Sequence, residues 1–207
     1  MTSTEPNRLA RLRGLLWIAV GVALLLGLGA WFLTSRHQPS AADSYATAFG
    51  GSFDMIDQYG RTVTDKTLRG KPYAIFFGFT RCPDVCPTSL SRMAQLRKQL
   101  GPDGGKFEIV FVSVDPGHDK REDIGRYLEL FGTPIVGLTG SQAQIDRIVK
   151  AFHVYYEKVP VEGGDYTIDH TASIFLMDRE GRFVTTIAHD ENQQVALEKL
   201  NRTIAGK

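Results

Sequence analysis

The two cysteines of this chain lie four residues apart, at Cys82 and Cys86, in the segment CPDVC. They directly follow the apolar run YAIFFGF of residues 73–79, whose composition is typical of a buried strand. If the chain begins a helix here, the two sulfurs converge, because positions i and i+4 share one helix face. Two thiols at one point can form a strained disulfide or hold a soft metal ion.

The simplest alternative is that Cys82 and Cys86 are small buried hydrophobic residues, since free cysteine is among the most buried residue types. The neighbouring Pro83, Asp84 and Pro87 are typical of an irregular turn rather than of a core element. A turn from strand to helix also favours the thiolate, because backbone N–H groups and the positive end of the helix dipole lie near the sulfur. The charge of Asp84 acts in the opposite direction, and we expect this residue to cap the turn.

The N-terminal segment indicates the compartment. Residues 15–33 carry no charge, and as a helix they would span about 28 Å, close to the ~30 Å hydrocarbon core of a bilayer. This run is longer than the ~7–15 apolar residues of a signal peptide and ends in Trp31-Phe32, which favours a retained anchor over a cleaved signal. The preceding arginines at positions 8, 11 and 13 should stay in the cytoplasm by the positive-inside rule.

We therefore expect a single-pass protein of the bacterial inner membrane whose C-terminal part lies in the periplasm. The expected parts are a cytoplasmic tail (1–14), a transmembrane anchor (15–33), a linker (34–49) and a folded domain (50–207). The periplasm is oxidising, but a disulfide that closes so short a loop would stabilise the fold little, so a purely structural disulfide is the weaker hypothesis. The formal net charge of +1 gives no reason to expect nucleic acid as a partner.

Strand and helix patterns alternate along the expected domain. The patterns predict a hairpin over 53–63, strands over 73–79, 107–114 and 135–138, helices over 87–100, 119–131 and 141–152, extended segments over 154–159 and 166–168, a final hairpin over 172–187 and a helix over 191–204. Ser141 and Gln144 form a predicted capping box. Alternation implies a parallel sheet, to which the final hairpin adds antiparallel strands. We expect an α/β fold with a mixed sheet, helices on both faces and a dithiol at a strand-to-helix junction, which is the thioredoxin-like arrangement.

Four of the five histidines have ordinary explanations as surface residues: His37 lies in the linker, His118 in a turn, and His153 and His189 near the ends of elements. His170 differs, because it lies where the chain enters a late strand. In thioredoxin-like proteins that position carries a cis-proline that packs against the active-site cysteines. An imidazole there would point at the two sulfurs and could act as a ligand or as a switch.

Three blocks of sequence resemble the Sco/SenC family of copper-binding assembly proteins: FFGFTRCPDVCP, FVSVDP and YTIDHTASIFLMD. The similarity covers about residues 50–204, and the anchor fits the usual layout of that family. The resemblance implies a thioredoxin fold in which copper, as Cu(I) or Cu(II), is held by Cys82, Cys86 and His170. It also implies delivery of copper, or of electrons, to the dinuclear copper centre of cytochrome c oxidase. The partner would be the copper-bearing oxidase subunit or another copper chaperone.

Two thiolates and one imidazole form a soft ligand set of low coordination number that suits Cu(I), whereas zinc would require a fourth ligand. Asp169 or a water molecule could supply that ligand, so the ligand types alone leave zinc open. Asp169 is also a candidate hydrogen-bond partner that orients His170. The alternative is that Asp169 is an exposed carboxylate in a loop.

Our leading hypothesis from the sequence is a membrane-tethered copper metallochaperone. The alternative is a thiol–disulfide oxidoreductase, with Cys82 and Cys86 as its catalytic residues, that keeps the copper-binding cysteines of the oxidase reduced. The three-residue spacer and the presence of His170 favour copper, since thioredoxins use a two-residue spacer and thiol exchange needs no imidazole. A peroxiredoxin is a weaker alternative, because neither cysteine fits the pattern Pro-x-x-x-Thr-x-x-Cys of those enzymes.

Overall fold

The computed structural model describes residues 7–35 and 46–206. Helix α1 (Asn7–Ser35) contains a stretch, Arg11–Phe32, that is long and apolar enough to cross a membrane. The anchor expected over 15–33 lies almost entirely within that stretch. The expected tail and linker fall partly outside the described residues, at 1–6 and 36–45, and His37 lies outside them as well.

From residue 46 on, seven strands form one mixed sheet in the order β2-β1-β5-β4-β3-β8-β9. Strands β3, β4 and β5 are parallel neighbours, whereas β1 and β8 pair antiparallel with β5 and β3. The strands are β1 Asp54–Asp57, β2 Thr62–Thr64, β3 Tyr73–Gly78, β4 Glu108–Ser113, β5 Val136–Thr139, β8 Ile174–Met177 and β9 Phe183–Ile187. The mixed, thioredoxin-like sheet predicted from the sequence is confirmed.

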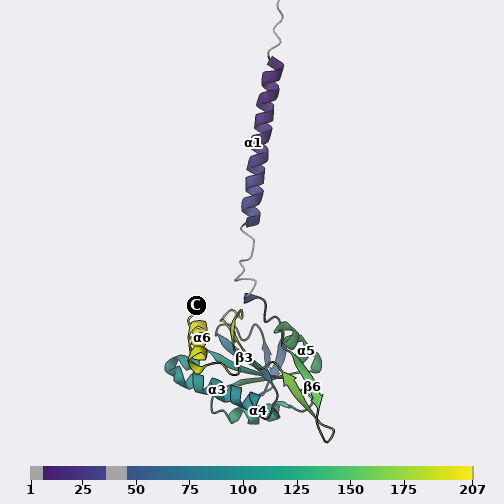
Figure 1. Ribbon diagram of the computed structural model, residues 1–207, viewed down its shortest axis with the longest axis vertical. Helices are drawn as coiled ribbons and strands as arrows, with labels where there is room; N and C mark the ends of the chain where they lie inside the picture. Colours follow the sequence, from purple (N-terminus) through teal and green to yellow (C-terminus); the bar gives the residue numbers. More distant parts are fainter. Residues whose placement is uncertain (1–6, 36–45, 207) are drawn as a thin grey trace, which may run out of the picture. The chain divides into compact units, whose positions relative to one another are not determined.

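Helices cover both faces of this sheet (Figure 1). They are α3 Val85–Gln99, the 3₁₀ helix η1 Gly101–Lys106, α4 Arg121–Glu129, α5 Gln142–Ala151 and α6 Gln193–Ala205. Side chains alternate between faces along a strand, so Phe76 and Phe111 share one face and Phe77 lies on the other. Tyr127 of α4 packs against Phe111, and Phe152 at the end of α5 packs against Phe77. Consequently α4 and α5 lie on opposite faces.

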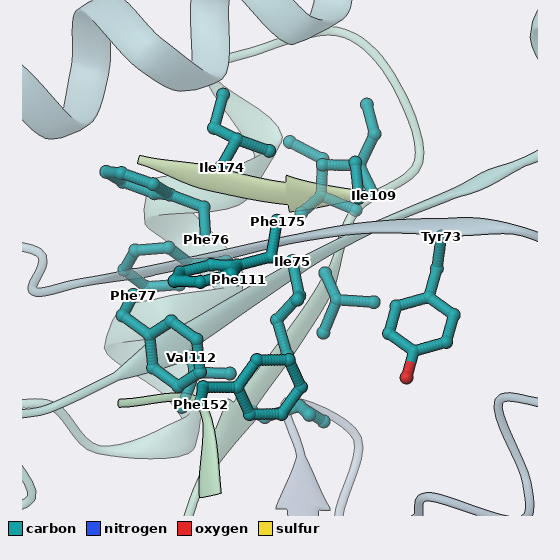
Figure 2. Packing of buried hydrophobic residues seen from close by; sticks show 14 of the residues in the cluster. Tyr73, Ile75, Phe76, Phe77, Ile109, Phe111, Val112, Phe152, Ile174 and Phe175 are labelled. Atoms are coloured by element: carbon teal, nitrogen blue, oxygen red, sulfur yellow. The ribbon is translucent and has the colours of Figure 1, made fainter. Parts of the chain in front are cut away.

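The core is built on β3 and β4, which are buried on both sides. All six residues of β3 are buried, as expected for a central strand covered by helices on both faces. The rings of Phe76 and Phe111 pack against each other, as do those of Phe77 and Phe152, and Figure 2 shows these aromatic side chains gathered around the central strands. Full burial of one such side chain contributes about 1.5–3 kcal/mol, so this layer holds the end of β3 rigidly in place.

Helix α3 begins at Val85, two residues before the start predicted from the sequence, so Cys86 lies in its first turn. Pro87 does not delay the helix, because the N–H groups of a first turn have no partner within the helix and a missing one costs nothing. Asp84 occupies the N-cap position, but its side chain makes no capping bond to a backbone N–H. Its carboxylate instead accepts a hydrogen bond from the hydroxyl of Thr88, so the capping role expected for Asp84 is wrong.

The segments predicted as extended around residues 154–170 form a separate two-stranded sheet. Strand β6 (Tyr156–Pro160) pairs antiparallel with β7 (Tyr166–His170), and His170 is the last residue of β7. A turn with two glycines at positive φ, Gly163 and Gly164, joins the strands. This hairpin is not hydrogen-bonded into the seven-stranded sheet, so His170 belongs to a different sheet from the strand that leads to the cysteines.

Candidate metal centre

The structure brings Cys82, Cys86 and His170 together. One ligand atom from each, two sulfurs and one imidazole nitrogen, lies within 4.8 Å of the other two. The Sγ of Cys86 is 3.4 Å from Nε2 of His170, which follows it by 84 residues. Both cysteines are free thiols; Cys86 is fully buried, and Cys82 is half-buried in the loop before α3. Cys82 and His170 are both partly exposed, so the cluster can be reached from solvent at these two side chains.

A glycine at the end of β3 makes room for the buried sulfur. A Cβ atom added to Gly78 would lie 2.6 Å from Sγ of Cys86, which is closer than real Cβ contacts allow. The added Cβ would also lie 3.1 Å from the ring of Phe111 and 3.2 Å from that of Phe76, so only glycine fits at this position beside the sulfur. Sequence analysis missed Gly78, although it stands within the same motif block as the cysteines.

The imidazole of His170 is fixed from both ends. Its Nδ1 lies 3.1 Å from the backbone carbonyl of Thr171, and only an N–H can donate to that oxygen. The proton therefore resides on Nδ1 in the neutral ring, which leaves the Nε2 lone pair facing the sulfurs. The rings of Phe76 and Phe79 both contact the imidazole edge-on, with centroids 5.9 Å away. This arrangement presents Nε2 as a preformed ligand.

Asp169 is exposed, and the structure gives His170 a different orienting partner. Neighbouring residues of a strand point to opposite sides, so Asp169 and His170 face away from each other in β7. Among the described residues, the hydrogen-bond acceptor at Nδ1 is the Thr171 carbonyl. The geometry therefore agrees with the second of our two hypotheses for Asp169, an exposed carboxylate.

The two cysteines have opposite acid–base properties. A hydrogen bond from the Cys86 thiol lowers the pKa of Cys82, and the backbone N–H groups of Asp84 and Cys86 act in the same direction. The same hydrogen bond, together with burial and the neighbouring Cys82 charge, raises the pKa of Cys86 far above its usual range. The pair therefore shares one proton, which stays on the buried sulfur while the accessible one is a thiolate.

One buried carboxylate, that of Asp119, fixes the conformation of the loop after β3. Asp119, which is buried, accepts hydrogen bonds from the backbone N–H and the hydroxyl of Thr80 and from the hydroxyl of Ser113. These bonds tie the loop after β3 to the end of β4. Sequence analysis did not identify Asp119, and its only signal was the Asp-Pro block that precedes it.

Two of the histidines expected to be surface residues have specific partners. His118 lies 3.0 Å from a carboxylate oxygen of Asp115, and His189 lies 3.2 Å from the hydroxyl of Ser89. Neither belongs to a cluster of potential metal ligands among the residues that the structure describes. Burial alone would raise the pKa of Asp115, but hydrogen bonds from Tyr166 and His118 hold it below the ordinary value.

Comparison with known proteins identifies the family. A family model described as SCO1/SenC matches residues 41–205. The chain belongs to the SCO1/SenC family. Another member, Protein sco1 of Schizosaccharomyces pombe, is 38% identical over 188 residues, which cover 86% of this chain and 72% of that protein. The resemblance inferred from the three motif blocks is confirmed.

Solved SCO1/SenC structures share the fold. ScoI of Bradyrhizobium japonicum, solved with copper bound, is 46% identical with a TM-score of 0.70, covering 75% of this chain and 99% of that one. BsSco is 24% identical with a TM-score of 0.62, covering 78% of this chain and 96% of that one. It is described as a member of the Sco family of cytochrome c oxidase assembly proteins with a disulfide switch. At that identity the likeness shows the fold alone.

Proposed function

We propose that this protein is a membrane-anchored copper carrier that takes part in assembling the copper centre of cytochrome c oxidase. Its ligands would be the sulfurs of Cys82 and Cys86 and Nε2 of His170. The observation that carries this proposal is the convergence of these three atoms within 4.8 Å from distant parts of the chain. Copper bound to ScoI, a relative of 46% identity, supports the choice of metal.

The ligand set fits copper on chemical grounds. Thiolates are soft ligands that select Cu(I), and an imidazole completes a three-coordinate site. Zinc prefers four ligands, and the protein side chain considered as a fourth, Asp169, is exposed and points away from His170, which leaves a water molecule as the fourth ligand for zinc. Bound copper would supply the charge that stabilises both sulfurs as thiolates. This ligand set therefore favours copper over zinc.

The residues of the site have distinct tasks. Cys82 is the half-buried member of the pair and already favours the thiolate, so it is suited to first contact with an incoming ion. Cys86 must release its proton as it becomes a ligand, so metal uptake should release protons. His170 contributes Nε2, which lies 3.4 Å from Sγ of Cys86 while Nδ1 is held by the carbonyl of Thr171.

A copper titration of the full chain in detergent, with reduced thiols, tests this function. The parent should bind one copper ion per chain, and His170→Ala should lose most of its affinity although both thiols remain. His189→Ala is the matched control, because it removes a half-buried imidazole from outside the cluster. The three-ligand site is wrong if His170→Ala binds copper as tightly as the parent.

Anchoring in the bacterial inner membrane, with the domain in the periplasm, is the second part of the proposal. The apolar stretch of α1 supports a membrane span, and the arginines before it support a cytoplasmic N-terminus. Protease added to intact spheroplasts should then degrade the domain that begins near residue 50. A domain that resists protease until the membrane is lysed would contradict this orientation.

The second candidate function is reduction of disulfides in the oxidase copper site, and the unequal pKa values of the cysteines favour it. The Cys82 thiolate would attack a partner disulfide and release one partner thiolate. The thiol of Cys86 would then pass its proton to the released partner thiolate and attack the sulfur of Cys82, which displaces the second partner sulfur as a thiolate. The partner thus gains two electrons and this protein retains a Cys82–Cys86 disulfide. If the reduced protein binds no copper but reduces such disulfides rapidly, this function replaces the carrier function.

A further inference from the structure

The hairpin that carries His170 is not paired with the strands of the main sheet beside the cysteines. Strands β6 and β7 pair only with each other among the strands that the structure describes, so the position of His170 relative to Cys82 and Cys86 depends on side-chain contacts and on the three-residue link to β8. In the middle of β7, Ile168 is buried in the core, and at the His170 end three residues link the strand to β8. At the opposite end, two residues, Asp165 and Tyr166, contact groups near the cysteines.

An ion pair joins the start of β7 to the loop of Cys82. Nη1 of Arg81, the residue directly before Cys82, lies 2.7 Å from a carboxylate oxygen of Asp165. The two side chains are 35% and 50% exposed, so solvent screens the pair and its contribution is modest. The guanidinium also lies above the ring of Tyr166, 5.5 Å from its centroid.

The second contact is buried and stronger. The hydroxyl of Tyr166 donates to Oδ1 of Asp115 at 2.6 Å. The side chain of Asp115 is fully buried, and its other carboxylate oxygen lies 3.4 Å from Arg81 and 3.0 Å from His118. Removing a donor from a buried carboxylate is costly, so Tyr166 is held firmly to the loop after β4. Lys158 of β6 donates to the same hydroxyl at 3.0 Å, which includes both strands in the network.

We propose that Arg81, Asp115, Asp165 and Tyr166 form a latch that sets how fast His170 leaves the metal site, and hence how fast bound copper passes to an acceptor. The proposal rests on the proposed copper function. Tyr166 and Asp165 are positioning residues, because they act through His170 and do not touch the metal. With the latch closed, β7 is held at both ends. With the latch open, the start of β7 is no longer held. His170 then moves away from the copper ion more often, and an acceptor can take its place as a ligand more easily.

Tyr166→Phe is the decisive variant, because it removes one hydroxyl and keeps the ring. Copper-loaded full chain in detergent is mixed with excess Cu(I) chelator, and release is followed by absorbance. We expect release about tenfold faster than in the parent, since a hydrogen bond to a buried charged group is lost. Tyr155→Phe is the matched control: it removes an exposed hydroxyl next to the same hairpin and should release copper at the parent rate.

Asp165→Asn tests the ion pair without altering any buried group. We expect release about two- to fivefold faster, as suits a partly exposed pair, and a rate near that of the parent in Asp165→Glu, which restores the charge. Glu162→Gln removes a negative charge from the same exposed turn and should have no effect.

Hydrogen exchange distinguishes a local latch from general loss of stability. In Tyr166→Phe the amides of β6 and β7 should exchange faster while those of β3 and β4 keep the parent rate. Equal acceleration in all four strands overturns the latch. So does a parent that binds copper through His170 while both Tyr166→Phe and Asp165→Asn release it at the parent rate. A parent that binds no copper overturns the proposed function, and the copper part of the latch with it.

Discussion

The Sγ of Cys86 occupies the space that a Cβ atom on Gly78 would need, because the two atoms would stand 2.6 Å apart. The last residue of β3 and the first turn of α3 are therefore matched to each other. A side chain at residue 78 must displace either the strand or the sulfur.

Gly78→Ala should destabilise the domain and impair the metal site. We expect a loss of about 1–3 kcal/mol in the free energy of unfolding, as in other overpacked cores, together with weaker copper binding. Urea unfolding and copper titration measure the two effects. Gly105→Ala is the matched control, since an added Cβ there meets no atom within 4 Å. Wild-type copper affinity in Gly78→Ala would contradict the close contact.

The reactivity of Cys82 in copper-free, reduced protein should depend on Cys86. The hydrogen bond from Cys86 is the largest cause of the lowered pKa of Cys82, so alkylation of Cys82 should persist well below pH ~8.5, where an ordinary thiol protonates. Cys86→Ala removes the donor and should move the alkylation midpoint upward. Cys86→Ser keeps a hydroxyl donor and should retain most of the shift. Equal midpoints in the two variants would contradict this assignment.

The carboxylate of Asp119 should contribute to the stability of the loop that leads to Cys82. Asp119→Asn weakens three hydrogen bonds from Thr80 and Ser113, and we expect a loss of about 1.5–3 kcal/mol in unfolding free energy. The buried thiol of Cys86 should also react faster with alkylating reagents. Glu122→Gln, an exposed change in the first turn of α4, is the control. If Asp119→Asn unfolds like Glu122→Gln, the loop is held by other contacts.

Asp57 should contribute stability that depends on pH. Its carboxylate is 1% exposed and accepts hydrogen bonds from Tyr59 and twice from Arg61. Burial raises its pKa, but these bonds outweigh burial and leave the pKa below the ordinary value. Its stabilisation is therefore present above pH ~4 and is lost as the pH falls through the lowered pKa.

Asp57→Asn should accordingly lower the unfolding free energy by about 2 kcal/mol at pH 7, with the difference from the parent shrinking below pH ~4. Urea unfolding across this pH range measures it. Asp103→Asn breaks an exposed ion pair with Lys106 and should cost less than about 1 kcal/mol. If the difference in unfolding free energy between Asp57→Asn and the parent grows in acid, the lowered pKa of Asp57 is contradicted.

Local signals predicted most of the fold. The capping box of Ser141 and Gln144 placed the start of α5 correctly, because such a box depends on residues three positions apart. The sequence predicts that α3 begins at Pro87, whereas it begins two residues earlier, at Val85. The difference arises because the first turn of a helix tolerates proline. The boundaries of these two helices depend on a few neighbouring residues, which is why local sequence signals predict them to within two positions.

Contacts between distant residues could be predicted only where the thioredoxin-like arrangement or the family resemblance indicated them. The three motif blocks pointed to Cys82, Cys86 and His170, whose ligand atoms the structure brings together. The pairing of Arg81 with Asp165 had no such signal. Arg81 lies in the loop before Cys82, and Asp165, 84 positions later, lies in a hairpin outside the main sheet. Neither spacing nor periodicity encodes a contact of that kind.

The separate pairing of β6 with β7 implies two levels of stability within one domain. Backbone hydrogen bonds join seven strands into a single cooperative sheet, whereas β6 and β7 form no strand pairing with it and are held by side-chain contacts and by the short segments that lead from α5 and into β8. The hairpin can therefore detach in a partial unfolding event that leaves the sheet intact. On heating, the protein should lose its third ligand, and with it the ability to retain an ion, at a lower temperature than it loses its fold.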